Sequence, residues 1–316
     1  MEDLLAAQCL DRRYAGPALK VIRRLVALQA QLPSTPAMTL AARIERVPDL
    51  EKLTNVQKTL LKVWCLRGTL HLVHSGDLPL LYGAVMRDWA DVMEKIMKRV
   101  DGLSAREIRA NERAMLRKLE EGPMTRNDLP NARAFHWGRG LRILGYKGLL
   151  IHAGRRGAEV VFDLRERWAP KSDLGKIPVR EARVELLKRY LAAYGPSSPR
   201  DFSYWTGMGV GDAARVFKDA GVKPGVPRAT RGPPRLLPRF DVFLLGHRDH
   251  SLYLDKRHYK KVFKPAAQIE PVFLVDGRIQ GTWSYDRMKL LPFAKIDAGV
   301  RKALEAEAEI LRPFLG

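Results

Sequence analysis

The stretch LLIHAGRRGAEVVFDL, residues 149–164, decides the fold prediction. Apolar runs stand on both sides of a Gly-Arg-Arg-Gly sequence, which predicts two strands joined by a turn. The residues before it read as three helices, at 106–122, 125–130 and 131–148. Three helices followed by a basic hairpin are typical of a winged helix, which is a helix-turn-helix motif with a β wing.

The same unit is strongly basic. Between Arg126 and Gly157 there are seven basic residues and one acidic residue, with His136 and Trp137 among them. Such a surface suits the phosphates of DNA, although a solvated basic face would have the same composition. The side chains that we expect to contact DNA from this unit are Arg139, Arg142, Lys147, Arg155 and Arg156.

The helical pattern recurs elsewhere in the chain. Residues 180–222 read as three further helices, with Pro and Ser at the start of one and Gly at the end of another. A weaker copy begins the chain, where 16–31, 35–47 and 54–78 read as helices followed by the β-like TLHLV. We therefore expect three winged-helix units in tandem.

A different module follows a proline-rich connection. Five prolines lie within residues 223–238. The stretches 239–254 and 270–284 after them read as strands, and the two strands of 270–284 are joined by a turn at Asp276-Gly277. Asp-Gly suits a type I′ hairpin turn. A capped helix at 297–316 ends the chain. The predicted fold class is α+β, mainly α, with tandem winged-helix domains and a C-terminal β-rich module. The predicted boundaries are 1–100 (carrying a Gln-Ala-Gln sequence at 29–31), 101–175, 176–230 and 231–316.

The composition indicates which kind of partner the protein binds and in which compartment it acts. The 316 residues carry 56 Lys and Arg against 35 Asp and Glu, a formal charge of +21, so a polyanion is the expected partner. The start of the sequence lacks the apolar core of a signal peptide, and no stretch approaches the length of a membrane span. Cys9 and Cys65 stand in apolar settings and read as buried thiols. We expect a cytoplasmic monomer that does not bind membranes.

The histidines do not have the spacing of a metal site. His247, His250 and His258 lie within GHRDHSLYLDKRH, and His71 and His74 within LHLVH, but neither group supplies four zinc ligands at close spacing. No phosphate-loop, zinc-protease, calcium-loop or nucleophile-elbow signature occurs. We expect no metal and no cofactor. The GHRDHS segment is either a hairpin tip that meets DNA or a polar turn that faces solvent.

Four dispersed motifs carry a resemblance to a known family. They are ALQAQLPSTP at 27–36, VWCLRGTLHLVHSGDLP at 63–79, LLPRFDVFLLGHRDHS at 236–251 and FLVDGRIQGTW at 273–283. In this order, over nearly the whole chain, they resemble the AlkZ/YcaQ family of bacterial DNA glycosylases, which has tandem winged-helix units and a QxQ or QxD motif. The chain is somewhat shorter than the family pattern leads us to expect, so trimmed loops could alter which lesions fit.

The resemblance implies a substrate and a set of site residues. It implies excision of N7-alkylated purines and unhooking of interstrand crosslinks joined through such purines, so the implied partner is double-stranded DNA that carries alkylated purines. The QxQ branch places its catalytic pair on Gln29 and Gln31. It also places a DNA-contacting hairpin on GHRDHS, with His247, Arg248 and Asp249 as its members.

An amide pair suits this chemistry. Alkylation at N7 makes the purine a good leaving group, and an amide oxygen can hold the attacking water and stabilise positive charge without ionising. Residues two apart on a continuous helix point roughly 200° apart, so the pair converges only where the helix ends near Gln31, at LPSTP. The alternative is that Gln29 and Gln31 are two solvated glutamines at the end of a helix. The protein would then be a non-catalytic transcriptional regulator built from winged helices.

Overall fold

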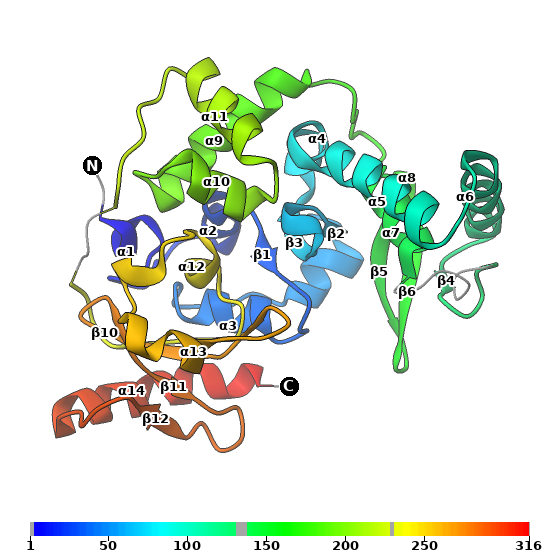
Figure 1. Cartoon of the computed structure of the whole chain (residues 1–316). Helices are drawn as coiled ribbons and strands as arrows, with labels where there is room; N and C mark the ends of the chain where they lie inside the picture. Colours follow the sequence, from blue (N-terminus) through cyan, green and yellow to red (C-terminus); the bar gives the residue numbers. More distant parts are fainter. Residues whose placement is uncertain (1–2, 131–137, 228–230, 316) are drawn as a thin grey trace. The chain divides into compact units, whose positions relative to one another are not determined.

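The computed structural model describes residues 3–130, 138–227 and 231–315, in a mixed arrangement of helices and strands (Figure 1). Contacts group the chain into two compact units, which we call unit 1 (Met1–Pro48 with Leu187–Gly316) and unit 2 (Asp49–Leu186). This grouping is coarser than the four predicted modules, whose boundaries stay a prediction. Within the described ranges, no helix has both the length and the apolar character that crossing a membrane requires.

Unit 2 is built on antiparallel strands that neighbour one another in the order β3-β2-β5-β6-β4. Helices α5, α6 and α7 pack with this sheet (Figure 1). The elements are η1 Lys52–Val56, β2 Leu60–Trp64, η2 Leu66–Gly68, β3 Leu70–His74, η3 Ser75–Asp77, α4 Leu78–Leu81, η4 Tyr82–Met86, α5 Arg87–Val100, α6 Ala105–Glu120, β4 Met124–Thr125, α7 Arg139–Tyr146, β5 Leu150–Arg156, β6 Glu159–Leu164 and α8 Arg165–Trp168, with α9 Val179–Tyr194 running across the boundary between the units.

The core of unit 2 explains why α7 packs closely on the sheet. Trp64 of β2 stacks on Phe162 of β6, with ring centroids 6.2 Å apart. A Cβ atom at Gly145 of α7 would lie 2.4 Å from the Trp64 ring, so only glycine allows this close approach. Met97 and Ile108 bring α5 and α6 into the same apolar cluster.

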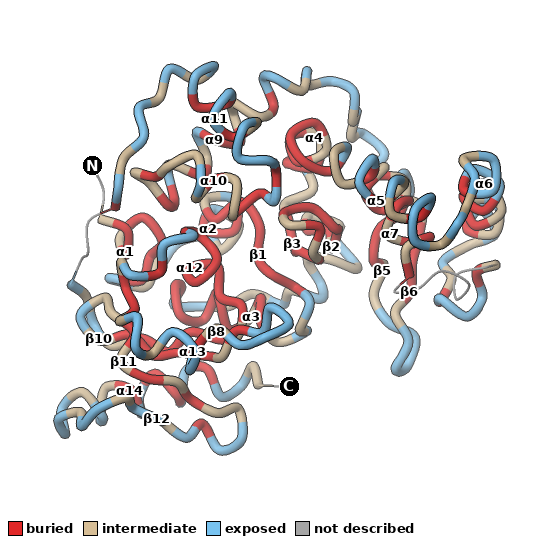
Figure 2. Tube along the Cα trace, viewed as in Figure 1, coloured by how far each residue is buried: buried red, intermediate tan, exposed pale blue. Residues whose placement is uncertain are grey.

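The predicted basic hairpin is confirmed, but its turn lies two residues later than expected. The turn is Gly157-Ala158, so Arg155 and Arg156 end β5, and a register shift before Arg155 accompanies a positive φ of 98° at Gly154. Figure 2 shows the base of this hairpin buried and its tip exposed.

The helices predicted before the hairpin are partly confirmed. The first corresponds to α6, which Ser104 begins with a capping box. The short helix expected at 125–130 is wrong, because Met124 and Thr125 instead pair with β6 as β4 and a turn follows. The third is confirmed over α7, while His136 and Trp137 lie outside the described residues.

Unit 1 combines short helices with a four-stranded sheet in the order β12-β11-β10-β7. Its elements are α1 Leu4–Ala7, α2 Ala18–Leu25, β1 Leu28–Gln29, α3 Thr35–Ala41, α10 Pro199–Thr206, α11 Val210–Asp219, β7 Arg235–Leu237, α12 Val242–Leu245, η6 His250–Leu252, η7 Lys256–His258, α13 Tyr259–Val262, β8 Phe263–Lys264, β9 Gln268–Ile269, β10 Val272–Val275, β11 Arg278–Trp283, β12 Leu290–Pro292, α14 Ala298–Leu311 and η8 Arg312–Phe314.

Several predicted elements are confirmed. The hairpin of β10 and β11 turns at Asp276 and Gly277, which both have the positive φ values of a type I′ turn, 49° and 72°. The final helix is α14, with the Asp297 side chain as its N-cap. The three helices expected over 180–222 are α9, α10 and α11, and α10 has Ser198 as N-cap and Gly207 as C-cap.

Two predicted elements are wrong. Within residues 54–78, the β-like TLHLV is confirmed by β3, but the helix expected before it is wrong, because Leu60–Trp64 pairs antiparallel with β3 as β2. Residues 239–254, expected to be strands, form α12 and η6 instead. The Asp241 side chain accepts a hydrogen bond from the backbone N–H of Phe243, which caps a helical turn and ends the extended chain.

A fully buried ion pair ties α3 to the start of α12. The guanidinium of Arg43 donates to both carboxylate oxygens of Asp241, at 2.6 and 2.8 Å, and neither side chain is exposed. Arg43 also donates to the Thr39 carbonyl at 2.8 Å, and Gln8 accepts a longer bond of 3.4 Å. A buried ion pair is excluded from water, so removing either partner leaves an uncompensated charge in the protein interior.

Replacing Asp241 by Ala should strongly destabilise the protein, because it leaves the Arg43 guanidinium buried without its counter-ion. Breaking a buried pair in this way costs about 3–5 kcal/mol. Urea unfolding measures the change. Arg312→Ala, which removes a solvent-exposed pair with Glu309, is the control and should have little effect. Equal unfolding midpoints for the two variants would contradict the assigned role of the pair.

Candidate functional site

The two glutamines of the QAQ motif lie at the end of a short strand, with Gln29 as the last residue of β1 and Gln31 in a bend two residues later. Helix α2 ends at Leu25, Val26 has a positive φ of 71°, and the chain continues as β1, so the expectation of a helix reaching almost to Gln31 is wrong. The Tyr194 hydroxyl, which donates to the Leu25 carbonyl at 3.3 Å, takes up one carbonyl of the last helical turn. The backbone that carries the pair is thus a strand end followed by a bend and not a helix.

The pair therefore converges without a distorted helix. The Nε2 of Gln29 donates to the Oε1 of Gln31 at 3.1 Å. Gln29 is only 3% exposed, whereas Gln31 is exposed. The buried amide thus fixes the orientation of the exposed one. An amide oxygen has two lone pairs, so Gln31 Oε1 can accept a second hydrogen bond from the solvent side.

The residues after the pair anchor it to other motifs of unit 1. The Thr35 hydroxyl at the start of α3 donates to the Arg239 carbonyl at 3.2 Å, which joins the first and third motifs. The Trp283 indole N–H lies 3.0 Å from the Leu237 carbonyl, which joins the third and fourth. The second motif forms the β2–β3 hairpin of unit 2.

The GHRDHS segment is a turn between α12 and η6, not the tip of a β-hairpin. His247 is 1% exposed, and its Nε2 bonds the Tyr194 carbonyl at 2.7 Å. Burial lowers the pKa of this imidazole, which keeps the ring neutral. His247 is thus a buried core group, and its contact with DNA stays a prediction. Arg248 and Asp249 are exposed.

Asp201 holds this turn to the start of α10. One carboxylate oxygen accepts the Arg248 backbone N–H at 2.9 Å, and the other accepts the Ser198 hydroxyl at 2.6 Å. A cavity of about 340 Å³ opens beside these groups, and its lining includes Arg200, Arg248 and Asp249. The exposed part of the segment is therefore fixed in place, with two arginines at a concave surface.

The five basic residues predicted in unit 2 fall into two groups. Arg139 is paired with Asp101, and Lys147 contacts both oxygens of Glu112, at 2.6 and 2.8 Å. These two cations already have close partners on neighbouring elements. The others are Arg142, which is half-buried, and Arg155 and Arg156, which are exposed; Arg156 forms a longer, exposed ion pair with Asp128 at 3.4 Å. Contact with DNA stays a prediction for all five residues. Arg155 and Arg156, and to a lesser extent Arg142, can reach a ligand from the surface without first breaking a close ion pair.

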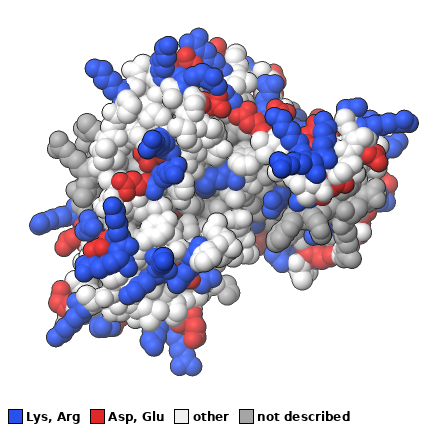
Figure 3. Space-filling view, in the orientation of Figure 1, with Lys and Arg blue, Asp and Glu red and all other residues white. Residues whose placement is uncertain are grey.

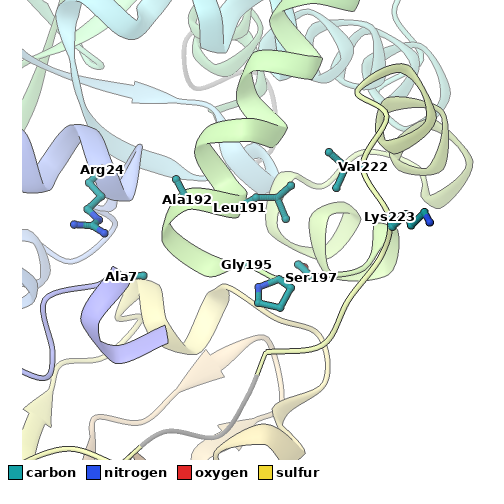
Figure 4. A pocket seen from close by; sticks show the side chains of 9 residues that line it. Ala7, Arg24, Leu191, Ala192, Gly195, Ser197, Val222 and Lys223 are labelled. Atoms are coloured by element: carbon teal, nitrogen blue, oxygen red, sulfur yellow. The ribbon is translucent and has the colours of Figure 1, made fainter. Parts of the chain in front are cut away.

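A cavity of about 570 Å³ in unit 1 lies apart from the predicted residues (Figure 4). Its lining is mostly small and apolar, and Arg24 and Lys223 stand at opposite sides of it. Neither glutamine and no residue of GHRDHS lines it. We assign it no chemistry.

The predicted buried thiols are confirmed. Cys9 and Cys65 are both free and buried, and burial raises the pKa of Cys65 to about 12, so it is not a thiolate. Burial also lowers the pKa of His71 to about 3. Across the described ranges, no three His, Cys, Asp or Glu side chains come together in a way that could hold a metal ion.

Comparison with known proteins identifies the class. The sequence model described as DNA glycosylase AlkZ-like matches residues 22–314, so the chain belongs to the AlkZ-like DNA glycosylase family. The predicted resemblance is confirmed. An interstrand DNA cross-link repair glycosylase of Streptomyces sahachiroi is 28% identical, over 95% of this chain and 91% of the relative. The solved structure of Streptomyces sahachiroi DNA glycosylase AlkZ superposes with a TM-score of 0.81 at 25% identity, covering 99% of this chain and 95% of the other.

The exposed arginines at the hairpin tip should set the salt dependence of DNA binding. Affinity for undamaged duplex should fall with salt at a log–log slope of several units, and Arg155→Ala or Arg156→Ala should each reduce the slope by roughly 0.9, because each removes one phosphate contact. Fluorescence anisotropy titrations at several salt concentrations measure this. Lys95→Ala removes an exposed cation of α5 and is the control. An unchanged slope in both hairpin variants would remove the tip from the interface.

Proposed function

We propose that this protein is a monofunctional DNA glycosylase that hydrolyses the N-glycosidic bond of N7-alkylated purines in double-stranded DNA and unhooks interstrand crosslinks joined through such purines. The observation that carries the proposal is the Gln29–Gln31 hydrogen bond, with Gln31 exposed beside it. Family membership supports a glycosylase over a regulator. The crosslink substrate is supported by the name of the Streptomyces sahachiroi relative.

The chemical step separates a cationic base from the sugar. The C1′–N9 bond breaks, its electron pair neutralises the charge on the alkylated purine, and an oxocarbenium-like centre develops at C1′. The water oxygen bonds to C1′ and its proton passes to solvent, which leaves an abasic sugar with a hydroxyl at C1′. In this scheme Gln31 Oε1 accepts a hydrogen bond from the attacking water, as a base does in glycoside hydrolysis generally.

The amide pair also stabilises charge. Gln29 donates to the oxygen of Gln31 and so holds the negative end of that amide dipole in one direction. A preorganised dipole that faces developing positive charge lowers the barrier without the cost of reorientation. A carboxylate would be a stronger base, but a glutamine suffices where alkylation has already weakened the bond. Normal purines, which are poorer leaving groups, would then react slowly.

We further propose that unit 2 contains a winged helix. The element order α6, β4, α7, β5, β6 gives a helix, a short strand, a helix and an exposed basic hairpin, the order of that motif. Arg142, Arg155 and Arg156 would contact duplex phosphates from it, and Arg248 and Asp249 would contact DNA from unit 1. The protein would act as a monomer, without metal or cofactor.

The glutamine pair should act in the chemical step and not in binding. Gln31→Ala should cut single-turnover excision of N7-methylguanine by roughly 10²-fold, as removal of one preorganised polar group does, with little change in affinity. Gln29→Ala should have a similar effect, because it releases the orientation of Gln31. Gln57→Ala, at an exposed glutamine, is the matched control. Wild-type excision by both variants, with unchanged melting temperatures, would contradict the catalytic assignment.

Excision should survive chelation. Since no metal takes part in the proposed step, pretreatment with EDTA should leave the single-turnover rate of N7-methylguanine release unchanged. A matched sample dialysed without EDTA is the control. If activity were lost on chelation and restored by zinc or magnesium, the scheme based on the amide pair alone would be wrong.

A further inference from the structure

We propose that residues 256–264 of unit 1 form an accessory site for single-stranded DNA, in which an unpaired base stacks on Tyr259 while neighbouring cations hold the phosphates. The inference rests on the proposed function only in taking DNA as the nucleic acid. We call this site the Tyr259 surface. Its exposed members are Lys256, Arg257, Tyr259, Lys260, Lys261 and Lys264.

The first observation is a concentration of positive charge. Five of the nine residues in the segment are Lys or Arg, and all five are exposed. Arg257 pairs with Asp255 at 2.8 Å, whereas the four lysines form no ion pair with any residue that the structure describes. Lys and Arg side chains cover the part of the surface around α13 (Figure 3). Unpaired cations held close together attract a polyanion such as a DNA strand.

The second observation is a stack of aromatic rings that ends at the surface. The His250 side chain is buried, with 7% of its surface exposed, and its ring centroid lies 3.9 Å from that of Phe263. Tyr259 stacks on Phe263, with centroids 4.9 Å apart and planes 21° apart. Tyr259 is 43% exposed. The inner rings fix the orientation of the outer one, so a ligand that stacks on Tyr259 meets a ring that is already ordered.

The combination favours an unpaired base over a duplex. Bases inside a duplex have both faces covered by their neighbours, so an exposed tyrosine can stack only on a base that is unpaired. Cations that follow the backbone, together with an aromatic platform for the bases, are the arrangement by which proteins bind single strands without sequence preference. Among the four lysines, Lys261 lies with its Nζ 5.2 Å from the centroid of Phe293, the one such cation–aromatic contact of these lysines within the described residues.

The Tyr259 surface is also close to the predicted DNA-contacting turn. Hydrogen bonding from Ser251 lowers the pKa of Asp249, and the charge of Lys256 contributes to the shift. Lys256 therefore lies near Asp249, which lines the same cavity as Arg248. A strand held at the Tyr259 surface could thus continue toward Arg248 within unit 1.

The test is binding of a fluorescein-labelled oligothymidylate of about 12 nucleotides, a length within the range that one such surface covers. At fixed low salt, Tyr259→Ala should weaken binding by roughly 5- to 150-fold, the range that loss of one base–aromatic stack gives. Tyr259→Phe keeps the ring and should bind like the wild type. Lys260→Ala and Lys261→Ala should each lower the log–log salt slope by roughly 0.7, whereas Lys302→Ala on α14 should leave it unchanged.

Three outcomes would overturn the proposal. The first is that wild type and Tyr259→Ala bind the oligothymidylate with equal affinity. The second is that Tyr259→Phe weakens this binding as much as Tyr259→Ala does. The third is that Tyr259→Ala weakens binding to a blunt duplex of the same length as much as it weakens binding to the oligothymidylate. Excision of N7-methylguanine from a short duplex is measured in parallel. Tyr259→Ala should retain it, whereas Gln31→Ala should lose it and keep its affinity for the oligothymidylate. The two proposals therefore succeed or fail separately.

Discussion

The buried pairing of Arg43 with Asp241 is the interaction on which unit 1 most depends. It joins α3, the first helix after the glutamine pair, to the start of α12, and Gln8 extends the same network toward α1. With both charges excluded from water, the two segments cannot separate without leaving an uncompensated ion. The pair therefore holds α3 against the segment that continues into the Arg248 turn, and α3 in turn packs on β1, the strand that ends at Gln29.

Much of the fold could be predicted where local chemistry and tertiary packing agree. Asp276-Gly277 specified its own turn, and Ser198 with Pro199 began a helix as expected. The predicted elements that are wrong lie where local sequence preference and tertiary packing favour different structures. Residues 60–64, LLKVW, read as part of a helix, yet they pair as β2 with β3 because burial within a sheet outweighs a weak intrinsic preference.

The candidate site was predictable in its residue types but not in its geometry. The spacing of Gln29 and Gln31 forbids convergence on a helix. Only the positive φ of Val26, the strand that ends at Gln29 and the bend at Gln31 show how the side chains meet. Likewise, no sequence pattern separates His247, which faces inward, from Arg248, which faces solvent. Arg139 and Lys147, which form partly buried ion pairs, could not be told from the exposed Arg155 and Arg156, because their acidic partners are distant in sequence.

The central claim is that Gln29 and Gln31 act as one unit in the chemical step. A double-mutant cycle on single-turnover release of N7-methylguanine tests it most directly, using the two Ala variants and their combination. If Gln29 acts by orienting Gln31, the double variant should be no slower than Gln31→Ala alone, so that the two effects are strongly non-additive. Fully additive effects, or wild-type release by the double variant in a folded protein, would contradict the account.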